Sequence, residues 1–187
     1  MTLEQFLDWE ERQEAKYEFN GYEPVLMAGG TEEQAEIQAN ILIALGSRLQ
    51  GHRCRVLGSD LKIKVMERIR YPDAFVVYSP RERGRTVVTD PVIVFEIIND
   101  STQHTDLVEK NDEYRETPSI RRYIILEQTH IGGIAFVRSG NDRWNSSALN
   151  GPEAVVDLAE IGISLPLGEF YAGMSLLETD RSPSEPA

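Results

Sequence analysis

The sequence predicts an α/β fold in which a mixed β-sheet is flanked by helices, and three patterns indicate it. Two strongly apolar runs, residues 74–78 and 92–98, are typical of buried strands. Apolar residues recur at every fourth position from Ile37 to Leu49, which is the spacing of a helix that buries one face. Two later apolar runs, residues 122–126 and 133–137, add further strands.

Length and composition fit one globular domain. The chain has 187 residues, of which 41% are hydrophobic and 27% are charged. No run approaches the roughly 18 apolar residues that a membrane span needs, and the first residues lack the features of a signal peptide, so we expect a cytoplasmic protein. We expect the domain to cover residues 1–177 and the polar residues 178–187 to form a disordered tail.

The distribution of charge bears on whether nucleic acid is a partner. The formal net charge of −12 argues against it, because phosphate contacts need lysine and arginine. From Arg48 to Arg85, however, ten basic residues stand against four acidic ones, a net of +6, which leaves −18 for the rest of the chain. One edge of the protein can therefore be basic, although a solvated acidic surface explains most of the negative excess.

The pattern of the N-terminal residues predicts a helix followed by a β-hairpin. Residues 3–14 form an amphipathic pattern with Phe6 on the apolar side. Residues 17–19 and 23–27 flank Asn20-Gly21, and an Asn-Gly pair between apolar segments is a strong hairpin signal.

A long helix and an antiparallel strand pair are expected next. Thr31 can cap the helix, Gln34 is placed to close a capping box with it, and Gly51 can end it. Residues 53–57 and 61–65 alternate polar and apolar side chains around a turn, which predicts that these two segments pair with each other.

After the apolar strands we expect a second helix, another strand and a closing segment. Capping residues at 100–102 precede a helix from about residue 106 to residue 116, which Pro118 ends. Residues 143–149, around a tryptophan, follow as a strand, and residues 162–177 are expected to form a final packed turn.

Two carboxylates mark the apolar strands as a candidate site. Asp73 immediately precedes one strand, and Glu96 lies inside the other. A buried, unpaired charge costs several kcal/mol, so Glu96 requires a lysine, an arginine or a metal ion. The alternatives are structural: an ion pair of Glu96 with Lys110 or Arg122, and an Asp73 that only caps a turn.

Acids at neighbouring strand ends can also hold a divalent cation through oxygen ligands. Such a cation activates water and stabilises a leaving oxygen, as phosphodiester hydrolysis requires. A nearby lysine would orient the nucleophile or neutralise developing charge. Lys110 taken alone is better explained as a solvated helix residue or as the partner of Asp106 four residues before it, and only its register with the two acids makes a role in the site equally well supported. Asp60 is better explained by the turn in which it lies than by metal ligation.

A series of motifs resembles one known family across almost the whole chain. The motifs are Phe6-Leu7-Asp8-Trp9-Glu10, Tyr17-Glu18-Phe19, Met27-Ala28-Gly29-Gly30-Thr31, Gly58-Ser59-Asp60-Leu61, Tyr71-Pro72-Asp73, Glu96 after a 22-residue gap, Ser101-Thr102, Asp106, Lys110, Tyr114, Pro118 to Tyr123, Leu165-Pro166-Leu167 and Tyr171-Ala172-Gly173. In this order they resemble the bacterial family called "putative restriction endonuclease", formerly a domain of unknown function, in the PD-(D/E)XK nuclease superfamily.

The resemblance implies a restriction-endonuclease-like core and Mg2+-dependent cleavage of DNA, with Mn2+ as a possible substitute. It implies metal ligation by Asp73, Glu96 and the backbone carbonyl of Ile97. The superfamily's usual lysine, two residues after the second acid, is replaced here by Ile98, and Lys110 is the expected substitute. Glu18 is the candidate outer carboxylate for a second metal ion.

Two points are left open by the resemblance. Many family members carry a histidine where this chain has Gln34, so a catalytically inactive binding or assembly module is an alternative, as is a nuclease acting on RNA or on nucleic-acid ends. By analogy with enzymes that cut both strands of a duplex, we expect a homodimer acting on double-stranded DNA.

Overall fold

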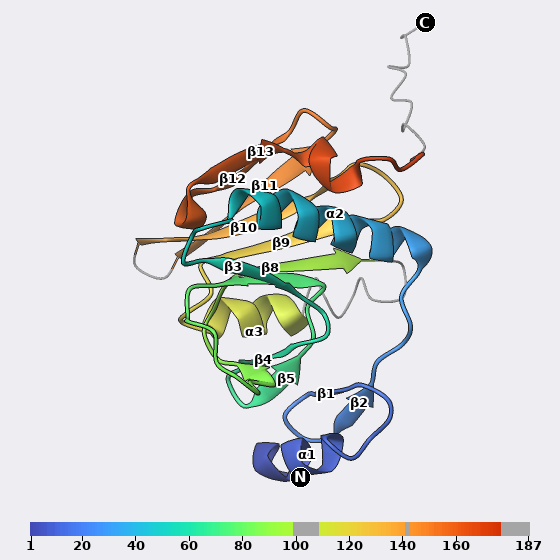
Figure 1. Cartoon of the computed structure of the whole chain (residues 1–187), viewed down its shortest axis with the longest axis vertical. Coiled ribbons are helices and arrows are strands. Elements are labelled where there is room, and N and C mark those ends of the chain that lie inside the picture. The colour runs from blue at the N-terminus through green and yellow to red at the C-terminus, as the bar shows by residue number, and fades with distance from the viewer. Residues whose placement is uncertain (99–108, 141–142, 177–187) are drawn as a thin grey trace, which may run out of the picture.

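The computed structural model describes residues 1–98, 109–140 and 143–176 (Figure 1). Its elements are α1 (Leu3–Glu10), β1 (Tyr17–Phe19), β2 (Pro24–Leu26), α2 (Glu32–Arg48), β3 (Arg55–Gly58), β4 (Lys62–Val65), β5 (Arg68–Arg70), β6 (Ala74–Val77), β7 (Val87–Val88), β8 (Pro91–Ile98), α3 (Asn111–Glu116), β9 (Arg122–Glu127), β10 (Gly132–Ser139), β11 (Arg143–Asn150), β12 (Val155–Leu158), the 3-10 helix η3 (Ala159–Ile161), β13 (Ile163–Pro166) and the 3-10 helix η4 (Leu167–Tyr171). None of the helices in these ranges is both long enough and apolar enough to cross a membrane.

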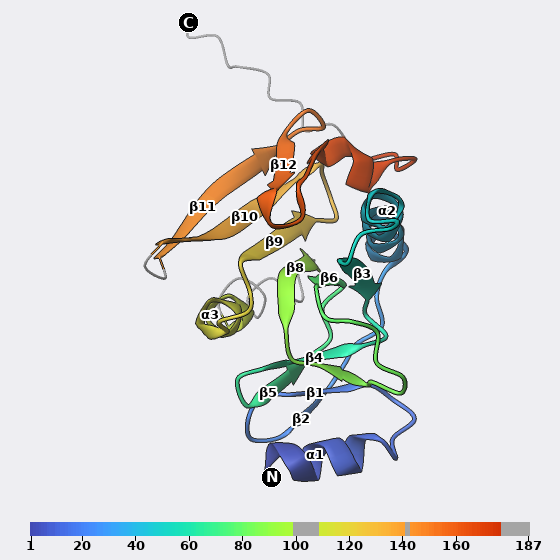
Figure 2. The ribbon, with the colours of Figure 1, turned by 60° about the vertical axis from the view of Figure 1, so that its left-hand side comes forward.

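A mixed six-stranded sheet carries the candidate strands. Its order is β11-β10-β9-β8-β6-β3, with β8 antiparallel to β6 and parallel to β9. All eight residues of β8 are buried, as expected of a strand with neighbours on both edges and packing on both faces. Figure 2 shows α2 and α3 on opposite faces of this sheet. The expected mixed sheet flanked by helices is confirmed.

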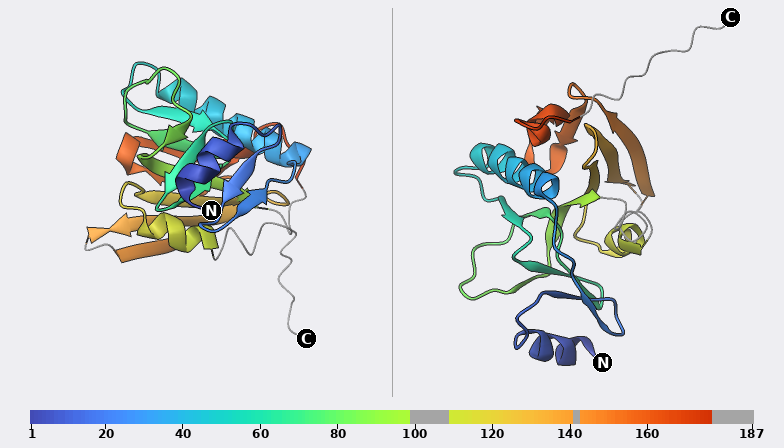
Figure 3. Two further views of the ribbon diagram at one scale, coloured as in Figure 1. Left: turned by 90° about the horizontal axis from the view of Figure 1, so that it is seen from below. Right: turned by 90° about the vertical axis from the view of Figure 1, so that its right-hand side faces the viewer.

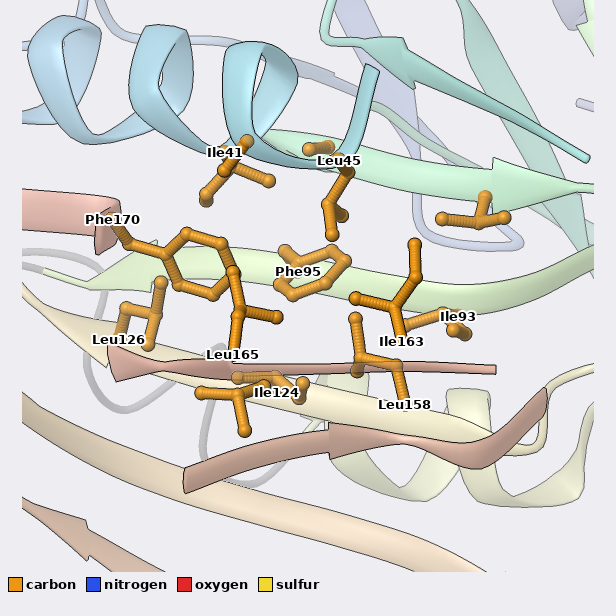
Figure 4. Close-up of a cluster of buried hydrophobic side chains, with 14 of the residues drawn as sticks. Ile41, Leu45, Ile93, Phe95, Ile124, Leu126, Leu158, Ile163, Leu165 and Phe170 are labelled. Carbon is orange, nitrogen blue, oxygen red and sulfur yellow. The ribbon is translucent and has the colours of Figure 1, made fainter. Parts of the chain in front are cut away.

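Alternation along the strands builds a separate core on each face. On the α2 face, Phe95 and Ile124 pack with Ile41 and Leu45 of the helix and with Phe170 of η4 (Figure 4). The predicted stripe of α2 is therefore buried as expected, and the β12–β13 hairpin closes the same core. In β8 and β9, the residues that alternate with this buried set point to the opposite face of the sheet, toward α3 and β4.

A smaller five-stranded sheet, in the order β2-β1-β5-β4-β7, lies on the α3 side. The predicted hairpin is confirmed, because β1 and β2 pair antiparallel with Tyr17 opposite Leu26. Its loop is held by the Asn20 side chain, which accepts from the N–H groups of Tyr22 and Glu23, and by Gly21 at φ 99°. Helix α1 packs beneath this hairpin, at the end of the molecule away from β12 and β13 (Figures 1 and 3).

The expected pairing of residues 53–57 with residues 61–65 is wrong. Both segments form strands, but β3 pairs with β6 in the larger sheet, and β4 pairs with β5 in the smaller one. The tight turn lies one strand later, at Met66-Glu67, where Met66 takes the left-handed φ of 54°. Alternation predicts a strand and its buried face, but it does not identify the partner strand.

Two further boundaries differ from expectation, and two expectations lie outside the described residues. Helix α1 ends at Glu10 rather than residue 14, because Arg12 N–H and the Gln13 side chain both donate to the carbonyl of Trp9 and tighten the last turn. Part of the expected closing turn is strand β13, paired with β12. The beginning of the helix predicted at residue 106 and the predicted tail lie outside the described residues.

Candidate functional site

The strand register brings the two predicted acids together. Ala74 of β6 is paired with Phe95 of β8, so the residues that follow this pair, Asp73 and Glu96, are neighbours where the antiparallel ladder ends. Asp73 is 7% and Glu96 3% exposed, so both carboxylates are buried at this end of the strands.

Asp73 is held by neutral donors within the described residues. Its Oδ2 accepts from the backbone N–H of Ile97 at 2.7 Å, and its Oδ1 accepts from Gln34 Nε2 at 2.7 Å. Gln38, one helical turn along α2, donates to the Asp73 backbone carbonyl at 2.7 Å. Thr31 caps α2 as predicted, but no capping box forms because the Gln34 side chain reaches Asp73 instead.

Glu96 meets a cation and a hydroxyl on the next helical segment. Lys110 Nζ lies 3.0 Å from Glu96 Oε1, and the Tyr114 hydroxyl donates to the same oxygen at 2.6 Å. Lys110, the residue just before α3, and Tyr114 are four positions apart, so their side chains lie on the same side of this helical segment. Lys110 is only 9% exposed, which excludes a solvated surface lysine.

Beyond Lys110, the ionic contacts continue into the smaller sheet. Glu18 Oε1 of β1 lies 3.8 Å from Lys110 Nζ and accepts from the Tyr71 N–H at 3.0 Å. Arg70 of β5 donates to Glu18 Oε2 at 2.8 Å and to both oxygens of Glu113 at 2.6 and 2.7 Å. The fork geometry fixes the guanidinium in the plane of the Glu113 carboxylate. We call Glu96, Lys110, Glu18, Arg70 and Glu113, with Asp73, the strand-end cluster.

Burial and charge shift the pKa values of groups in this cluster. Burial alone would raise the pKa of Glu18, but the positive charges of Lys110 and Arg70 outweigh it and hold that pKa below the ordinary 4.5. Burial, together with the Glu96 charge, raises the pKa of Tyr114 well above 10.0. Tyr114 therefore keeps its proton and serves as a donor.

A second buried ionic group lies under α1. Glu10 is paired with Lys62 of β4, and it also accepts from the Tyr71 hydroxyl at 2.5 Å. Glu10 and Lys62 are 8% and 6% exposed. We call Glu10, Lys62 and Tyr71 the helix-docking cluster, because its contacts join α1 to the smaller sheet.

Asp73 and Glu96 provide carboxylate oxygens, which are the type of ligand that a hard divalent cation prefers. Mg2+ keeps several waters and is usually bound through only one or two protein carboxylates, a number that Asp73 and Glu96 supply. In the described part of the chain, no group of three or more histidine, cysteine or acidic residues is arranged to hold a metal ion. Neither the 440 Å3 pocket beside Arg70 and Glu113 nor the 860 Å3 pocket beside β3 is lined by Asp73 or Glu96.

The structure places the predicted site residues as follows. Glu96, Lys110 and Glu18 form one series of ionic contacts, and Asp73 accepts from the N–H of Ile97, the residue after Glu96. Lys110, and not Arg122, is the ion-pair partner of Glu96, because Arg122 binds Glu160 at 2.9 Å. Asp60 is fully exposed in the turn before β4, and its carboxylate pairs with Lys16. This agrees with the turn interpretation.

Sequence reasoning missed two features of this site. Arg70 is 2% exposed and joins Glu18 to Glu113, yet it stands in a short arginine-rich segment that we did not interpret as a strand. The contact of Gln34 with Asp73 was also missed. The Gln34 side chain can bond either at the helix cap or to a buried acid, and the sequence does not show which of the two partners it takes.

Comparison with known proteins gives one family. The profile of the Uma2 family, described as "Putative restriction endonuclease", matches residues 3–168. Two curated relatives from Synechocystis sp. are similar over most of their length. Uncharacterized protein slr1290 is 27% identical, covering 94% of this chain and 93% of that protein, and uncharacterized protein sll1609 is 23% identical, covering 85% and 93%.

One solved structure has the same fold. It is a crystal structure from Anabaena variabilis, described as "a putative nuclease belonging to DUF820". The TM-score is 0.75 at 15% sequence identity, with 91% of this chain and 97% of that chain covered. At this identity the likeness shows the fold alone.

Proposed function

Because the chain belongs to the Uma2 putative restriction endonuclease family, we propose that it hydrolyses phosphodiester bonds of DNA with a divalent ion, Mg2+ or Mn2+. Asp73 and Glu96 are the proposed metal ligands, with the backbone carbonyl of Ile97 as a third. The observation that supports the proposal is the β6–β8 ladder, whose Ala74–Phe95 pair makes Asp73 and Glu96 neighbours at the strand end, with Lys110 Nζ 3.0 Å from Glu96 Oε1.

Asp73 and Glu96 would hold the cation, which when bound would supply a Lewis acid able to lower the pKa of a water molecule and stabilise the leaving oxygen. Lys110 supplies positive charge beside Glu96, where it orients the attacking water and offsets the negative charge that develops on the phosphate. The hydroxyl of Tyr114 holds Glu96 Oε1 in place. Glu18, on the other side of Lys110, keeps the ammonium group directed into the site.

Plasmid cleavage with and without Mg2+ tests the proposal. We expect the purified protein to nick or linearise plasmid DNA with Mg2+ or Mn2+, and to lose this activity in EDTA and in Asp73→Asn. Manganese titration by calorimetry should give binding to the wild type and much weaker binding to Asp73→Asn. If neither protein binds manganese and the plasmid stays intact, the enzyme proposal is wrong.

A catalytically inactive binding module is the second candidate, and the Gln34 contact favours it. The amide of Gln34 donates to Asp73 Oδ1, an oxygen that a metal ion would need. A neutral histidine at this position could instead offer a ring nitrogen as an acceptor. Under this candidate, Gln34→His gains metal binding and cleavage that the wild type lacks. Wild-type cleavage at least equal to that of Gln34→His rejects it.

Substrate and assembly are tested separately. Circular duplex, linear duplex, single-stranded DNA and RNA distinguish an endonuclease on DNA from an enzyme acting on RNA or on ends. We further propose a homodimer, since two sites related by twofold symmetry would cut both strands of a duplex. Analytical ultracentrifugation should then give twice the 21.1 kDa mass of the chain.

A further inference from the structure

A second concave surface lies at the free edge of the six-stranded sheet. β3 is the last strand of the sheet order, and a pocket of 860 Å3 lies between it, the C-terminal end of α2 and residues 81–83. Leu49 and Cys54, both buried, lie in its apolar lining. His52, Arg55, Arg81 and Arg83 supply its basic lining. We call this surface the β3 groove.

The arginines of the β3 groove keep their positive charge available. Arg55 donates to the carbonyl oxygens of Ser79 at 2.7 Å and Pro80 at 3.2 Å, which are neutral acceptors. Arg81 and Arg83 are exposed, and among the described residues no carboxylate forms an ion pair with either.

Neighbouring arginines outside the groove behave differently. Arg48 binds Glu169 at 2.8 Å, and Arg85 binds Asp90 at 2.7 Å. Glu82 is the one acid in the lining. The half negative charge that a helix dipole places at the end of α2 is small beside three guanidinium groups. In a chain of net charge −12, the groove is therefore locally positive.

The groove is connected to the strand-end cluster by β3 itself. Arg55 begins the strand and Gly58 ends it, where Gly58 is paired with Ala74, the residue after Asp73. A Cβ placed on Gly58 would lie 3.8 Å from the Asp73 carbonyl oxygen. Three residues of strand span roughly 10 Å, which corresponds to about three nucleotides along one strand of a duplex.

We propose that the β3 groove binds the phosphate backbone of a nucleic acid beside the strand-end cluster, with Arg55 about three nucleotides from the end of β3 that adjoins Asp73. The inference rests on the proposed nuclease function for its choice of partner. Guanidinium groups spread over two elements suit a polymer with regularly spaced charges, because each can neutralise a different phosphate. The contacts would orient the substrate without reading its sequence.

The test compares two double variants that change the net charge equally, from −12 to −14. Arg81→Ala with Arg83→Ala removes two charges from the groove. Arg12→Ala with Arg143→Ala removes two exposed arginines elsewhere. Binding of a fluorescent duplex is measured by anisotropy in EDTA over a salt series, with circular dichroism as the check on folding.

We expect the groove variant to bind at least about tenfold more weakly than the wild type near 0.1 M salt, and its salt slope to fall by roughly 1.8 for two lost phosphate contacts. The control variant should keep the wild-type slope. Equal losses in both variants, no loss in the groove variant, or equally effective competition by polyglutamate of matched charge would overturn the inference.

Cleavage separates this inference from the proposed function. A wild type that cuts DNA while the groove variant binds and cuts equally well leaves the nuclease proposal intact and rejects the groove. A wild type that never cuts but binds DNA through the groove rejects the nuclease proposal and leaves the binding surface. If the wild type does not bind nucleic acid, both are wrong.

Discussion

Two buried ionic clusters in this protein contain similar types of residue but differ in the balance between negative and positive charges. The helix-docking cluster pairs one carboxylate, Glu10, with one ammonium group, Lys62, and a tyrosine hydroxyl completes the contacts of Glu10. The strand-end cluster contains four carboxylates, while its described cations are Lys110 and Arg70, and the partly exposed Arg68 lies 2.8 Å from Glu113 Oε1.

The difference separates a structural ion pair from a candidate site. A balanced pair with a complete set of hydrogen bonds needs nothing further, and breaking it costs stability. A group of carboxylates in excess of the cations around it favours additional positive charge, which a divalent ion supplies. The two clusters should therefore respond differently to the same chemical change.

The largest expected effect is on cleavage by Glu96→Gln. The substitution keeps the side-chain shape and removes the charge, so we expect at least about a 100-fold loss of plasmid cleavage, as for lost metal-site groups. The matched change in the other cluster, Glu10→Gln, should lower stability and leave the cleavage rate of the folded protein close to that of the wild type. Equal cleavage by Glu96→Gln and the wild type would remove Glu96 from the site.

The next effect is on stability, through Lys62→Met. This variant leaves the buried Glu10 carboxylate without its counter-charge, so the free energy of unfolding should fall by about 3–5 kcal/mol in urea titrations. Lys64→Met is the control, because Lys64 forms a partly exposed pair with Glu67 worth about 1 kcal/mol or less. Similar losses in both variants would mean that burial of the Glu10–Lys62 pair contributes little.

A pH series tests the charge environment of Glu18. Burial opposes its ionisation, but Lys110 and Arg70 lower its pKa below 4.5 in the folded state. A carboxyl group with a lowered folded pKa stabilises the fold above its unfolded pKa and loses that contribution as the pH falls through the folded value. The free energy of unfolding of the wild type should thus decline below about pH 4.5, and Glu18→Gln should decline less.

The exposed Glu23 provides the control for that series, because Glu23→Gln should retain the wild-type decline. If Glu18→Gln and Glu23→Gln have the same pH profile as the wild type, Lys110 and Arg70 do not act on Glu18 as the contacts indicate.

The smallest effects distinguish two tyrosine hydroxyls. Tyr114→Phe and Tyr71→Phe each remove one donor to a buried carboxylate, Glu96 or Glu10, so each should cost roughly 1–3 kcal/mol of stability. Only Tyr114→Phe should also slow cleavage, because Glu96 is the proposed ligand. Kinetic assays of both variants at a temperature where both are folded decide this, and slower cleavage by Tyr71→Phe alone would reverse the assignment.

Much of the local structure could be predicted because its causes are local. The buried stripe of α2, the Thr31 cap, the Asn20-Gly21 hairpin and the apolar strand β8 each depend on residues within a few positions of one another. Spacing and turn chemistry report such neighbours directly. The acid in β8 was recognisable for the same reason, since it interrupts an apolar run.

What the sequence alone determined, therefore, is most of the longer strands and helices, which faces they bury, and that Asp73 and Glu96 require an explanation. Only the tertiary structure decided the partners: β3 with β6, Gln34 with Asp73, and Arg70 with Glu113. These last two contacts join residues 39 and 43 positions apart. Hydrogen bonds and ion pairs at such separations depend on how sheets and helices pack, and short-range periodicity carries no record of that packing.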